Sequence, residues 1–388
     1  MKKSFLAGLS DAEFLRRHWQ KKPLLARNAL LDHAGAITRD RLFELAARDG
    51  VESRIVSRTR ARWHVRHGPF KPGDLRHLPS AGWTLLVQGA DLALPQAARL
   101  LAEFAFIPYA RLDDVMVSYA APGGGVGPHF DSYDVFLVQG EGERRWRVSA
   151  QRDLDLVADA PLRILKDFRP EHEWTLAPGD VLYLPPRYAH DGVALGECVT
   201  YSVGFRAPAA QEVGSRFLDF LHDRLALKGQ YADPDLEPAR RPALIPADML
   251  KRTAQVLEGL RWSAADVVDF AGRYLTEPKP NVVFERPRRP LSQPEFSRRV
   301  RRDGVRLALA SRMLFRGRRI FMNGEASTPG AAAARTAAQL ADARELRPPL
   351  TLPVEARALL YAWYRAGYIE LGQVHAAERS TPLPSARA

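Results

Sequence analysis

The spacing of apolar residues divides the chain into a strand-rich half and a helix-rich half. Between about residues 50 and 205, short apolar or alternating runs are separated by turns rich in glycine and proline, such as APGGGVGP, QGEGE and LPPR. Alternation of apolar and polar residues with a period of two is typical of strands with one buried face. Many short strands with such turns predict a β-sandwich or a β-barrel.

Helical periodicity flanks this strand-rich part. SDAEFLRRHWQ at residues 10–20 predicts a helix with Ser10 as its N-cap and Glu13 completing a capping box. After residue 208, apolar residues recur every three or four positions, which predicts helices that each bury one face. Three segments have this pattern: residues 211–227, 247–260 and 263–275.

The last third of the chain is a mixture of element types. TEPKPN at residues 276–281 breaks the helical run and indicates a linker. SRMLFRGRRIFMNGE predicts a hairpin, and an alanine-rich segment near 331–343 and an amphipathic helix in PVEARALLYAWYRAGYIEL follow it. The polar end at 377–388 is expected to be a disordered tail.

Composition narrows the class of protein. The 388 residues are 46% hydrophobic and 26% charged, as expected for a globular chain. The net charge of +12 favours an acidic or nucleic-acid-rich partner, although a solvated basic surface would also explain it. The single cysteine excludes an intrachain disulfide framework. With no signal peptide and no apolar run of about eighteen residues, we expect a cytoplasmic protein without a membrane span.

Candidate metal chemistry begins in GGGVGPHFDSYDVF at residues 123–136. His129 and Asp131 are two positions apart on a predicted strand, so their side chains lie on one face. In APGDVLYLPPRYAHDGV, His190 lies near the start of a later predicted strand. A double-stranded β-helix can bring that strand beside His129 and Asp131. Two imidazoles and one carboxylate leave three positions of an octahedron open, which suits Fe(II) oxygen chemistry. Structural zinc more often has four protein ligands, frequently including cysteine.

The open positions suggest a cosubstrate. 2-Oxoglutarate would occupy two of them and dioxygen the third, and the distal carboxylate of 2-oxoglutarate then needs a cation inside the barrel. GEGERRWRVSA offers planar guanidinium groups, which bind carboxylates well. By strand parity the inward residues are either Arg144, with Trp146 and Val148, or Arg145 and Arg147.

These motifs together resemble a known family. APGGGVGPHFDSYDVFLVQGEGERRWRV, FLRRHWQKKPLLARNAL, PGDVLYLPPRYAHDGVA and TYSVGFRAP are similar to segments of the bacterial JmjC-type ribosomal oxygenases, over roughly residues 10–208. The resemblance implies Fe(II)- and 2-oxoglutarate-dependent hydroxylation of an arginine of a large-subunit ribosomal protein, ribosomal protein sixteen. It also implies a homodimer.

The resemblance further implies a mixed α and β architecture. A double-stranded β-helix core of the JmjC/cupin type with N-terminal helices would occupy residues 1–208. A helical dimerisation domain at 209–280 and a winged-helix-like domain at 281–376 would follow. The apolar stripes of the helical domain need a partner surface, and Phe217, Phe220 and Leu221 form one of them.

Residue roles carry over by motif. His129, Asp131 and His190 are implied as the catalytic iron ligands, and Arg144 as the partner of the 2-oxoglutarate carboxylate. The family often has a serine where this chain has Ala120; Ser118 or Tyr133 could replace that cosubstrate contact.

Substrate contacts follow from the charge of the target. An arginine side chain needs a carboxylate near the mouth of the iron site. Asp113 and Asp114, at the start of DDVMVSYA, are the candidates, together with Ser202 in YSVGF. A solvated strand end would explain the two aspartates equally well.

Two other functions remain open at this point. A cupin-type metalloenzyme acting on a small molecule would need neither Arg144 nor the C-terminal domains. A non-catalytic nucleic-acid-binding protein would use the basic C-terminal domain, where residues 286–302 contain seven arginines. The same basic region fits contact between an enzyme and ribosomal RNA. An intact metal triad is hard to explain in a protein that only binds.

Overall fold

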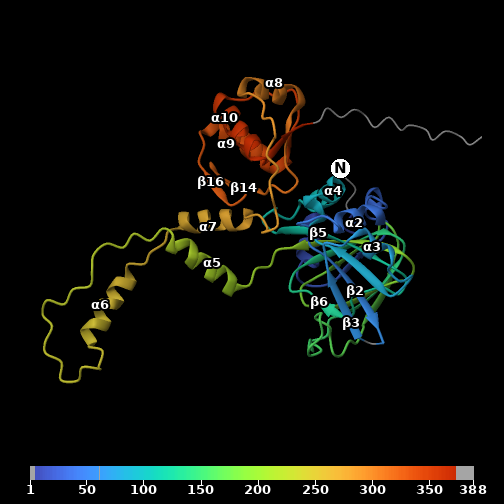
Figure 1. Cartoon of the computed structure of the whole chain (residues 1–388), viewed down its shortest axis with the longest axis horizontal. Coiled ribbons are helices and arrows are strands. Elements are labelled where there is room, and N and C mark those ends of the chain that lie inside the picture. The colour runs from blue at the N-terminus through green and yellow to red at the C-terminus, as the bar shows by residue number, and fades with distance from the viewer. Residues whose placement is uncertain (1–4, 61, 373–388) are drawn as a thin grey trace, which may run out of the picture.

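The computed structural model describes residues 5–60 and 62–372, which form a β-barrel unit, a helical arm and a C-terminal α/β unit (Figure 1). The expected disordered tail at 377–388 lies outside the described residues. Within the described ranges, no helix is both long and apolar enough to cross a membrane.

Two antiparallel sheets build the barrel and confirm the double-stranded β-helix. The larger sheet has the strand order β1 (Leu24–Ala26), β10 (Val181–Leu184), β7 (Val135–Glu141), β12 (Cys198–Phe205), β5 (Leu112–Ala120), β4 (Trp83–Val87), β2 (Ser53–Thr59) and β3 (Arg62–His67). The smaller sheet has the order β6 (His129–Phe130), β11 (Ala189–Ala194), β8 (Arg144–Ser149) and β9 (His172–Leu176). Strands β5, β6, β7 and β8 alternate between the sheets, so side chains from both converge inside the barrel.

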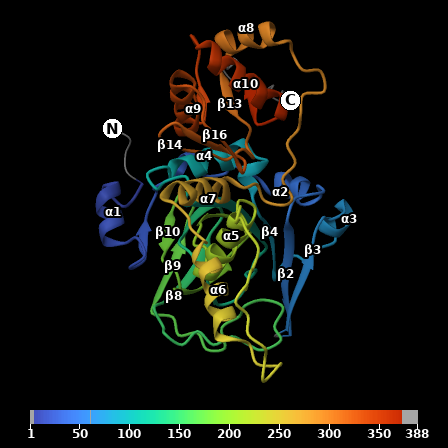
Figure 2. The same cartoon turned by 90° about the vertical axis from the view of Figure 1, so that its left-hand side faces the viewer.

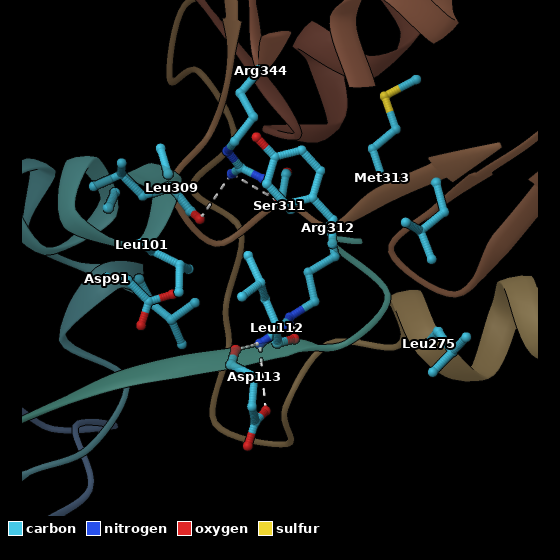
Figure 3. A pocket seen from close by; sticks show the side chains of 15 residues that line it. Asp91, Leu101, Leu112, Asp113, Leu275, Leu309, Ser311, Arg312, Met313 and Arg344 are labelled. Atoms are coloured by element: carbon cyan, nitrogen blue, oxygen red, sulfur yellow. Dashed lines mark hydrogen bonds and ion pairs between the residues drawn. The ribbon is translucent and has the colours of Figure 1, made fainter. Parts of the chain in front are cut away.

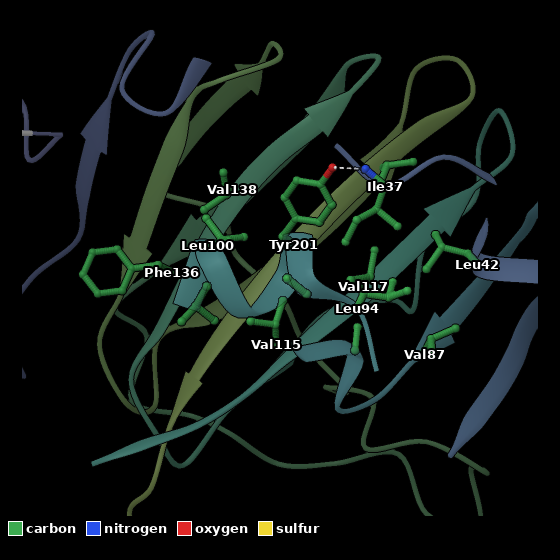
Figure 4. Packing of buried hydrophobic residues seen from close by; sticks show 14 of the residues in the cluster. Ile37, Leu42, Val87, Leu94, Leu100, Val115, Val117, Phe136, Val138 and Tyr201 are labelled. Carbon is green, nitrogen blue, oxygen red and sulfur yellow. Dashed lines mark hydrogen bonds between the residues drawn. The ribbon is translucent and has the colours of Figure 1, made fainter. Parts of the chain in front are cut away.

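Short helices cover the outer face of the larger sheet. They are α1 (Asp11–Arg17), η1 (Leu31–His33), α2 (Arg39–Ala46), α3 (Pro72–Arg76), η2 (Ala90–Leu92) and α4 (Pro95–Glu103). The predicted capping box of Ser10 and Glu13 is present at the start of α1. Leu94 and Leu100 pack over Val115 and Tyr201 of the sheet (Figure 4). This packing leaves the opposite face of the sheet to form the interior of the barrel.

The helical arm leaves the barrel after β12 and contains α5 (Ala210–His222), α6 (Ala247–Glu258) and α7 (Ala264–Thr276), as the periodicity predicts. In Figure 1, α5 and α6 extend away from the barrel, whereas α7 lies against the C-terminal unit. Neither α5 nor α6 has a residue buried within the single chain, so the burial of their predicted apolar faces by a partner stays a prediction. Phe217 and Phe220 are only half-buried, against Phe270 of α7, with ring centroids 5.1 and 5.7 Å away.

Many apolar side chains of the arm therefore face solvent in the part of the chain that the structure describes. The most exposed are Leu218, Leu236, Leu244, Ile245, Leu250, Val256, Leu257 and Trp262, each more than half accessible. An exposed apolar surface of this extent marks an interaction site in a natural protein.

The C-terminal unit has its own core. Its helices are α8 (Gln293–Asp303), α9 (Ala331–Ala343) and α10 (Val354–Ala366). Its two small sheets have the orders β17 (Glu345–Leu346), β13 (Val305–Leu307), β18 (Ile369–Leu371) and β14 (Met313–Arg316), β15 (Arg319–Met322), β16 (Glu325–Ser327). Phe296, Leu340 and Leu360 are fully buried between the helices and strands. Three helices with a β-hairpin confirm the winged-helix-like expectation.

The C-terminal unit packs directly on the barrel beside α4 (Figure 2). Arg312 donates to the main-chain carbonyl of Leu112 at 3.3 Å and to that of Asp113, at the start of β5 (Figure 3). Tyr109 donates to the carbonyl of Asp342 at 3.4 Å. Burial at this contact lowers the pKa of the Arg344 guanidinium and raises that of the Asp91 carboxyl to about 6, with Asp114 adding to the latter. The C-terminal unit is therefore held against the barrel by hydrogen bonds from both sides.

Candidate metal centre

Strands β6 and β11 bring the three predicted metal ligands together. His129 and His190 are direct partners in the antiparallel register, and Asp131 follows β6 immediately. One ligand atom from each of the three residues lies within 4.8 Å of those of the others. The imidazole centroids are 4.2 Å apart, and Nε2 of His190 is 3.7 Å from a carboxylate oxygen of Asp131. This spacing allows all three to bind one ion.

Main-chain carbonyls orient both imidazoles. Nδ1 of His129 lies 2.9 Å from the carbonyl of Gly127, and Nδ1 of His190 lies 2.9 Å from that of Tyr188. A carbonyl accepts only, so each Nδ1 carries the proton and each Nε2 keeps its lone pair for a metal. Burial, with a smaller effect of His129, lowers the pKa of His190 to about 4. The ring is therefore neutral near pH 7, as a metal ligand must be.

The glycine loop before His129 is needed for close packing. A β-carbon at Gly125 would lie 2.6 Å from the carbonyl oxygen of Gly192, in the strand that carries His190. At Gly127, where φ is +80°, it would lie 2.6 Å from the Trp63 ring. At Gly127, only glycine fits both the close contact with Trp63 and the left-handed backbone. The loop thus holds β6 against β11 and sets the position of His129.

The structure decides between the two parities of β8. Arg144, Trp146 and Val148 are buried and face inward, whereas Arg145 and Arg147 are half-exposed. Arg147 instead pairs with Asp191 at 2.5 Å. The alternative that Arg145 and Arg147 point into the barrel is therefore wrong.

The guanidinium of Arg144 is buried without an anionic partner. Its Nη1 donates to the hydroxyls of Ser118 at 3.1 Å and Thr200 at 3.2 Å. Its Nε is buried and has no hydrogen-bond partner, and no carboxylate of the described residues forms an ion pair with it. Burial lowers its pKa. Because an unpaired buried charge is costly, this arrangement is suited to receive an anion.

The metal cluster and Arg144 line the same cavity, of ≈ 590 Å³. Ser118, Tyr133, Asp113, Asp114 and Ser202 line it as well, so it contains every predicted site residue. Burial, followed by the nearby Asp131 carboxylate, raises the pKa of the Tyr133 phenol. Ala120, at the departure from the family pattern, packs with Ala194 and Cys198 in a small apolar cluster.

The two aspartates differ from a solvated strand end. Asp114 is 2% exposed and accepts from Lys279 at 2.6 Å, and from the Gln88 amide at 2.8 and 3.1 Å. Asp113 is more exposed and lies 3.6 Å from Lys279, 3.7 Å from Arg206 and 3.8 Å from Arg312. Neither carboxylate is a free surface charge.

Sequence reasoning missed three residues of this site. The sequence pattern could have identified Thr200, because Thr200 and Ser202 are two positions apart on β12 and their side chains share a face. Gln139 supports Thr200, whose hydroxyl donates to its side-chain oxygen at 3.1 Å. Lys279 had no local signal, because it comes from a linker 165 positions after Asp114.

Comparisons with known proteins agree with this geometry. A family model for the JmjC domain matches residues 99–213, and one for the ROXA-like winged helix matches residues 259–370. The ribosomal protein uL16 3-hydroxylase of Escherichia coli is 36% identical over 320 residues, which cover 82% of this chain and 85% of that protein. A probable ribosomal oxygenase of Haemophilus influenzae is 40% identical over 227 residues, covering 58% of this chain and 54% of the relative.

Solved structures extend the likeness to nearly the whole chain. The crystal structure of E. coli YcfD superposes with a TM-score of 0.82 at 32% identity, covering 93% of this chain and 98% of that one. YcfD in complex with cobalt and 2-oxoglutarate matches with a TM-score of 0.78 at the same identity and coverage. With this extent of similarity over both the barrel and the C-terminal unit, the chain belongs to the JmjC-domain ribosomal oxygenases.

Proposed function

We propose that this protein is an Fe(II)- and 2-oxoglutarate-dependent hydroxylase of an arginine in a large-subunit ribosomal protein, uL16. The observation that carries the proposal is the pairing, in one cavity, of a three-ligand metal cluster with a buried guanidinium that has no anionic partner. A metal-binding cupin acting on a neutral small molecule would not need the buried guanidinium of Arg144. The E. coli uL16 3-hydroxylase supports the choice of substrate.

In this proposal His129, Asp131 and His190 bind Fe(II). Their chemistry fits that ion, since two neutral imidazole nitrogens and one carboxylate form a facial triad. Fe(II) with 2-oxoglutarate and dioxygen supplies the oxidation that inserts one oxygen atom into a C–H bond. The chain itself orients the two imidazoles through the carbonyls of Gly127 and Tyr188.

Arg144 binds the distal carboxylate of 2-oxoglutarate. Ser118 and Thr200 hold its Nη1 and leave the rest of the guanidinium for the anion. Ser118 therefore acts mainly through Arg144, and the serine that the family often has at position 120 is not required for that pairing. Tyr133, on the cavity wall beside Asp131, is the second proposed cosubstrate contact.

The far wall of the cavity receives the substrate arginine. Asp114 and Asp113 supply negative charge there, and Ser202 on the adjacent strand supplies a hydroxyl. Gly204 lies beside the carboxylate, since a β-carbon there would be 3.9 Å from Oδ1 of Asp114, an ordinary contact distance. A carboxylate oxygen accepts a charge-assisted hydrogen bond from a guanidinium group, which would orient the arginine toward the metal.

The helical arm forms a homodimer in this proposal. A second copy would cover the exposed apolar residues of α5 and α6, neither of which has a buried residue in the described part of the chain. The basic segment 286–302 would contact ribosomal RNA near the substrate: Arg288, Arg289 and Arg298 are exposed there. A ribosomal substrate in turn places the enzyme in the cytoplasm.

Mass spectrometry tests the function directly. Purified enzyme, with Fe(II) and 2-oxoglutarate, is incubated with ribosomal proteins of its own organism. We expect the mass of one oxygen atom to be added to uL16, at an arginine located by fragmentation. The His190→Ala variant serves as the inactive control. Addition to another ribosomal protein would correct the substrate, and no addition to any of them would refute the proposal.

A further inference from the structure

Lys279 reaches the cavity wall from the C-terminal half of the chain. It lies in the linker between α7 and α8, and its Nζ is 2.6 Å from Oδ2 of Asp114. The same nitrogen is 3.6 Å from Asp113. A residue far along the sequence is thus the closest cation to both carboxylates of the proposed arginine-binding wall.

The lysine contacts the carboxylate without lining the metal cavity. Lys279 lines a surface groove together with Arg206 and Arg216 and does not line the metal cavity, although Asp113 lines both. Asp114 lines the metal cavity, and its Oδ1 is the oxygen beside Gly204. Lys279 therefore holds Oδ2, whereas among the described side chains Oδ1 accepts only from the neutral Gln88 amide, at 3.1 Å, and keeps a lone pair for a substrate.

Asp114 depends strongly on this contact. Its side chain is 3% exposed, and its only other side-chain partner among the described residues is the neutral amide of Gln88. Removing one member of a buried charge pair leaves the other uncompensated and free to seek new partners. Arg206 and Arg312, which already lie near Asp113, are the cations toward which the carboxylate would turn.

We propose that Lys279 is a positioning residue for substrate binding, which fixes the Asp114 carboxylate so that Oδ1 can receive the guanidinium of the target arginine. The inference rests on the proposed function, because it assigns Lys279 a part in arginine recognition. It gives the C-terminal half of the chain a role in the active site without contact with iron or 2-oxoglutarate.

The surrounding contacts support this coupling. Arg312 of the C-terminal unit holds the carbonyls of Leu112 and Asp113 (Figure 3). Arg206, which follows β12, donates to the carbonyl of Leu275 at 2.7 Å, near the end of α7. The start of β5 is thus in contact with Arg206 at the end of β12 and with Arg312 of the C-terminal unit. Docking of the C-terminal unit therefore holds the main chain directly before Asp114.

Steady-state kinetics of Lys279→Met test the inference. The substrate is a synthetic uL16 peptide that contains the arginine found to be modified. We expect KM for the peptide to rise roughly ten-fold, the loss typical of a hydrogen bond to a charged group. The kcat, and the turnover of 2-oxoglutarate without peptide, should stay within about two-fold. Lys279→Arg should restore most of the affinity, and Lys22→Met, at an exposed lysine, is the matched control.

A double-mutant cycle separates positioning from a direct contact. If Lys279 acts through Asp114, then Lys279→Met adds little to the KM of Asp114→Asn, because the two effects are not additive. Fully additive effects, or an unchanged KM in Lys279→Met, overturn the inference. A lower KM also overturns it, since that result would mean that Lys279 competes with the substrate. Should Lys279→Met fail to fold, Lys279→Gln takes its place, with the same expected rise.

Failure of the proposed function gives a different pattern. In that case wild-type protein does not hydroxylate the peptide, and Asp114→Asn has no KM to change. If the function holds and only this inference fails, wild type is active and Asp114→Asn is impaired, while Lys279→Met behaves as wild type.

Discussion

The metal cavity and the helical arm use apolar and polar residues in contrasting ways. In the barrel, the chain supplies the groups around the cavity and buries several of them, including charged ones such as Arg144 and Asp114. In the arm, α5 and α6 have amphipathic sequences but no buried residue. The barrel therefore gathers polar groups around a cavity, whereas the arm exposes apolar side chains to solvent. The first arrangement suits the proposed ligands and target arginine, and the second suits the second copy that we propose.

The largest effect is expected from the metal ligands. His129→Ala, Asp131→Ala or His190→Ala should abolish 2-oxoglutarate turnover, because two ligands cannot replace a facial triad. The fold should persist, since the ligands line a cavity. Turnover is measured by succinate release, and folding by circular dichroism. Full turnover in His190→Ala would show that the triad assignment is wrong.

A smaller loss is expected from the anion-binding end of the cavity. Arg144→Ala should raise the KM for 2-oxoglutarate roughly ten- to a hundred-fold, because a charge-assisted pair in a buried site is lost. Arg147→Ala is the control, since Arg147 faces Asp191 outside the cavity. An unchanged KM in Arg144→Ala, or an equal rise in both variants, contradicts the assignment.

The arm is tested by a change that leaves the cavity alone. Leu250→Lys with Leu257→Lys places charge on exposed positions of α6, 57% and 58% accessible in the single chain. We expect a monomer by light scattering where wild type is a dimer, with 2-oxoglutarate turnover retained. Phe217 and Phe220 are poorer targets than the sequence suggested, because they also pack on Phe270 within the chain. Wild-type protein that is already monomeric at micromolar concentration defeats the prediction.

The smallest effect is expected from the basic segment. Arg288→Glu, Arg289→Glu and Arg298→Glu together should weaken turnover of ribosome-associated substrate several-fold at low salt, and less at high salt. Turnover of a short peptide should not change, because these residues lie outside the cavity. An equal loss on peptide and ribosome, independent of salt, would place the segment at the active site instead.

Local sequence was sufficient for the pair of His129 and Asp131 and for most of the elements, whereas only the barrel brings His190 to that pair. A period of two puts His129 and Asp131 on one face of any strand, whatever the rest of the fold does. The capping box of Ser10 and Glu13 is equally local, and it is present. Thr200 could have been found by the same rule from Ser202. These features depend on residues a few positions apart, so short-range geometry determines them.

The tertiary structure decided what depends on distant segments. Strand parity alone left Arg144, or else Arg145 and Arg147, as the inward residues. The family resemblance favoured Arg144, and the fold places Arg144 inside the barrel. Lys279 meets Asp114 only because the linker returns to the barrel, and Arg312 reaches β5 only because the C-terminal unit docks there. Amphipathic periodicity predicted the helices of the arm but not that their apolar faces stay uncovered. Periodicity specifies which face is apolar, and packing between segments far apart in the sequence specifies what covers it.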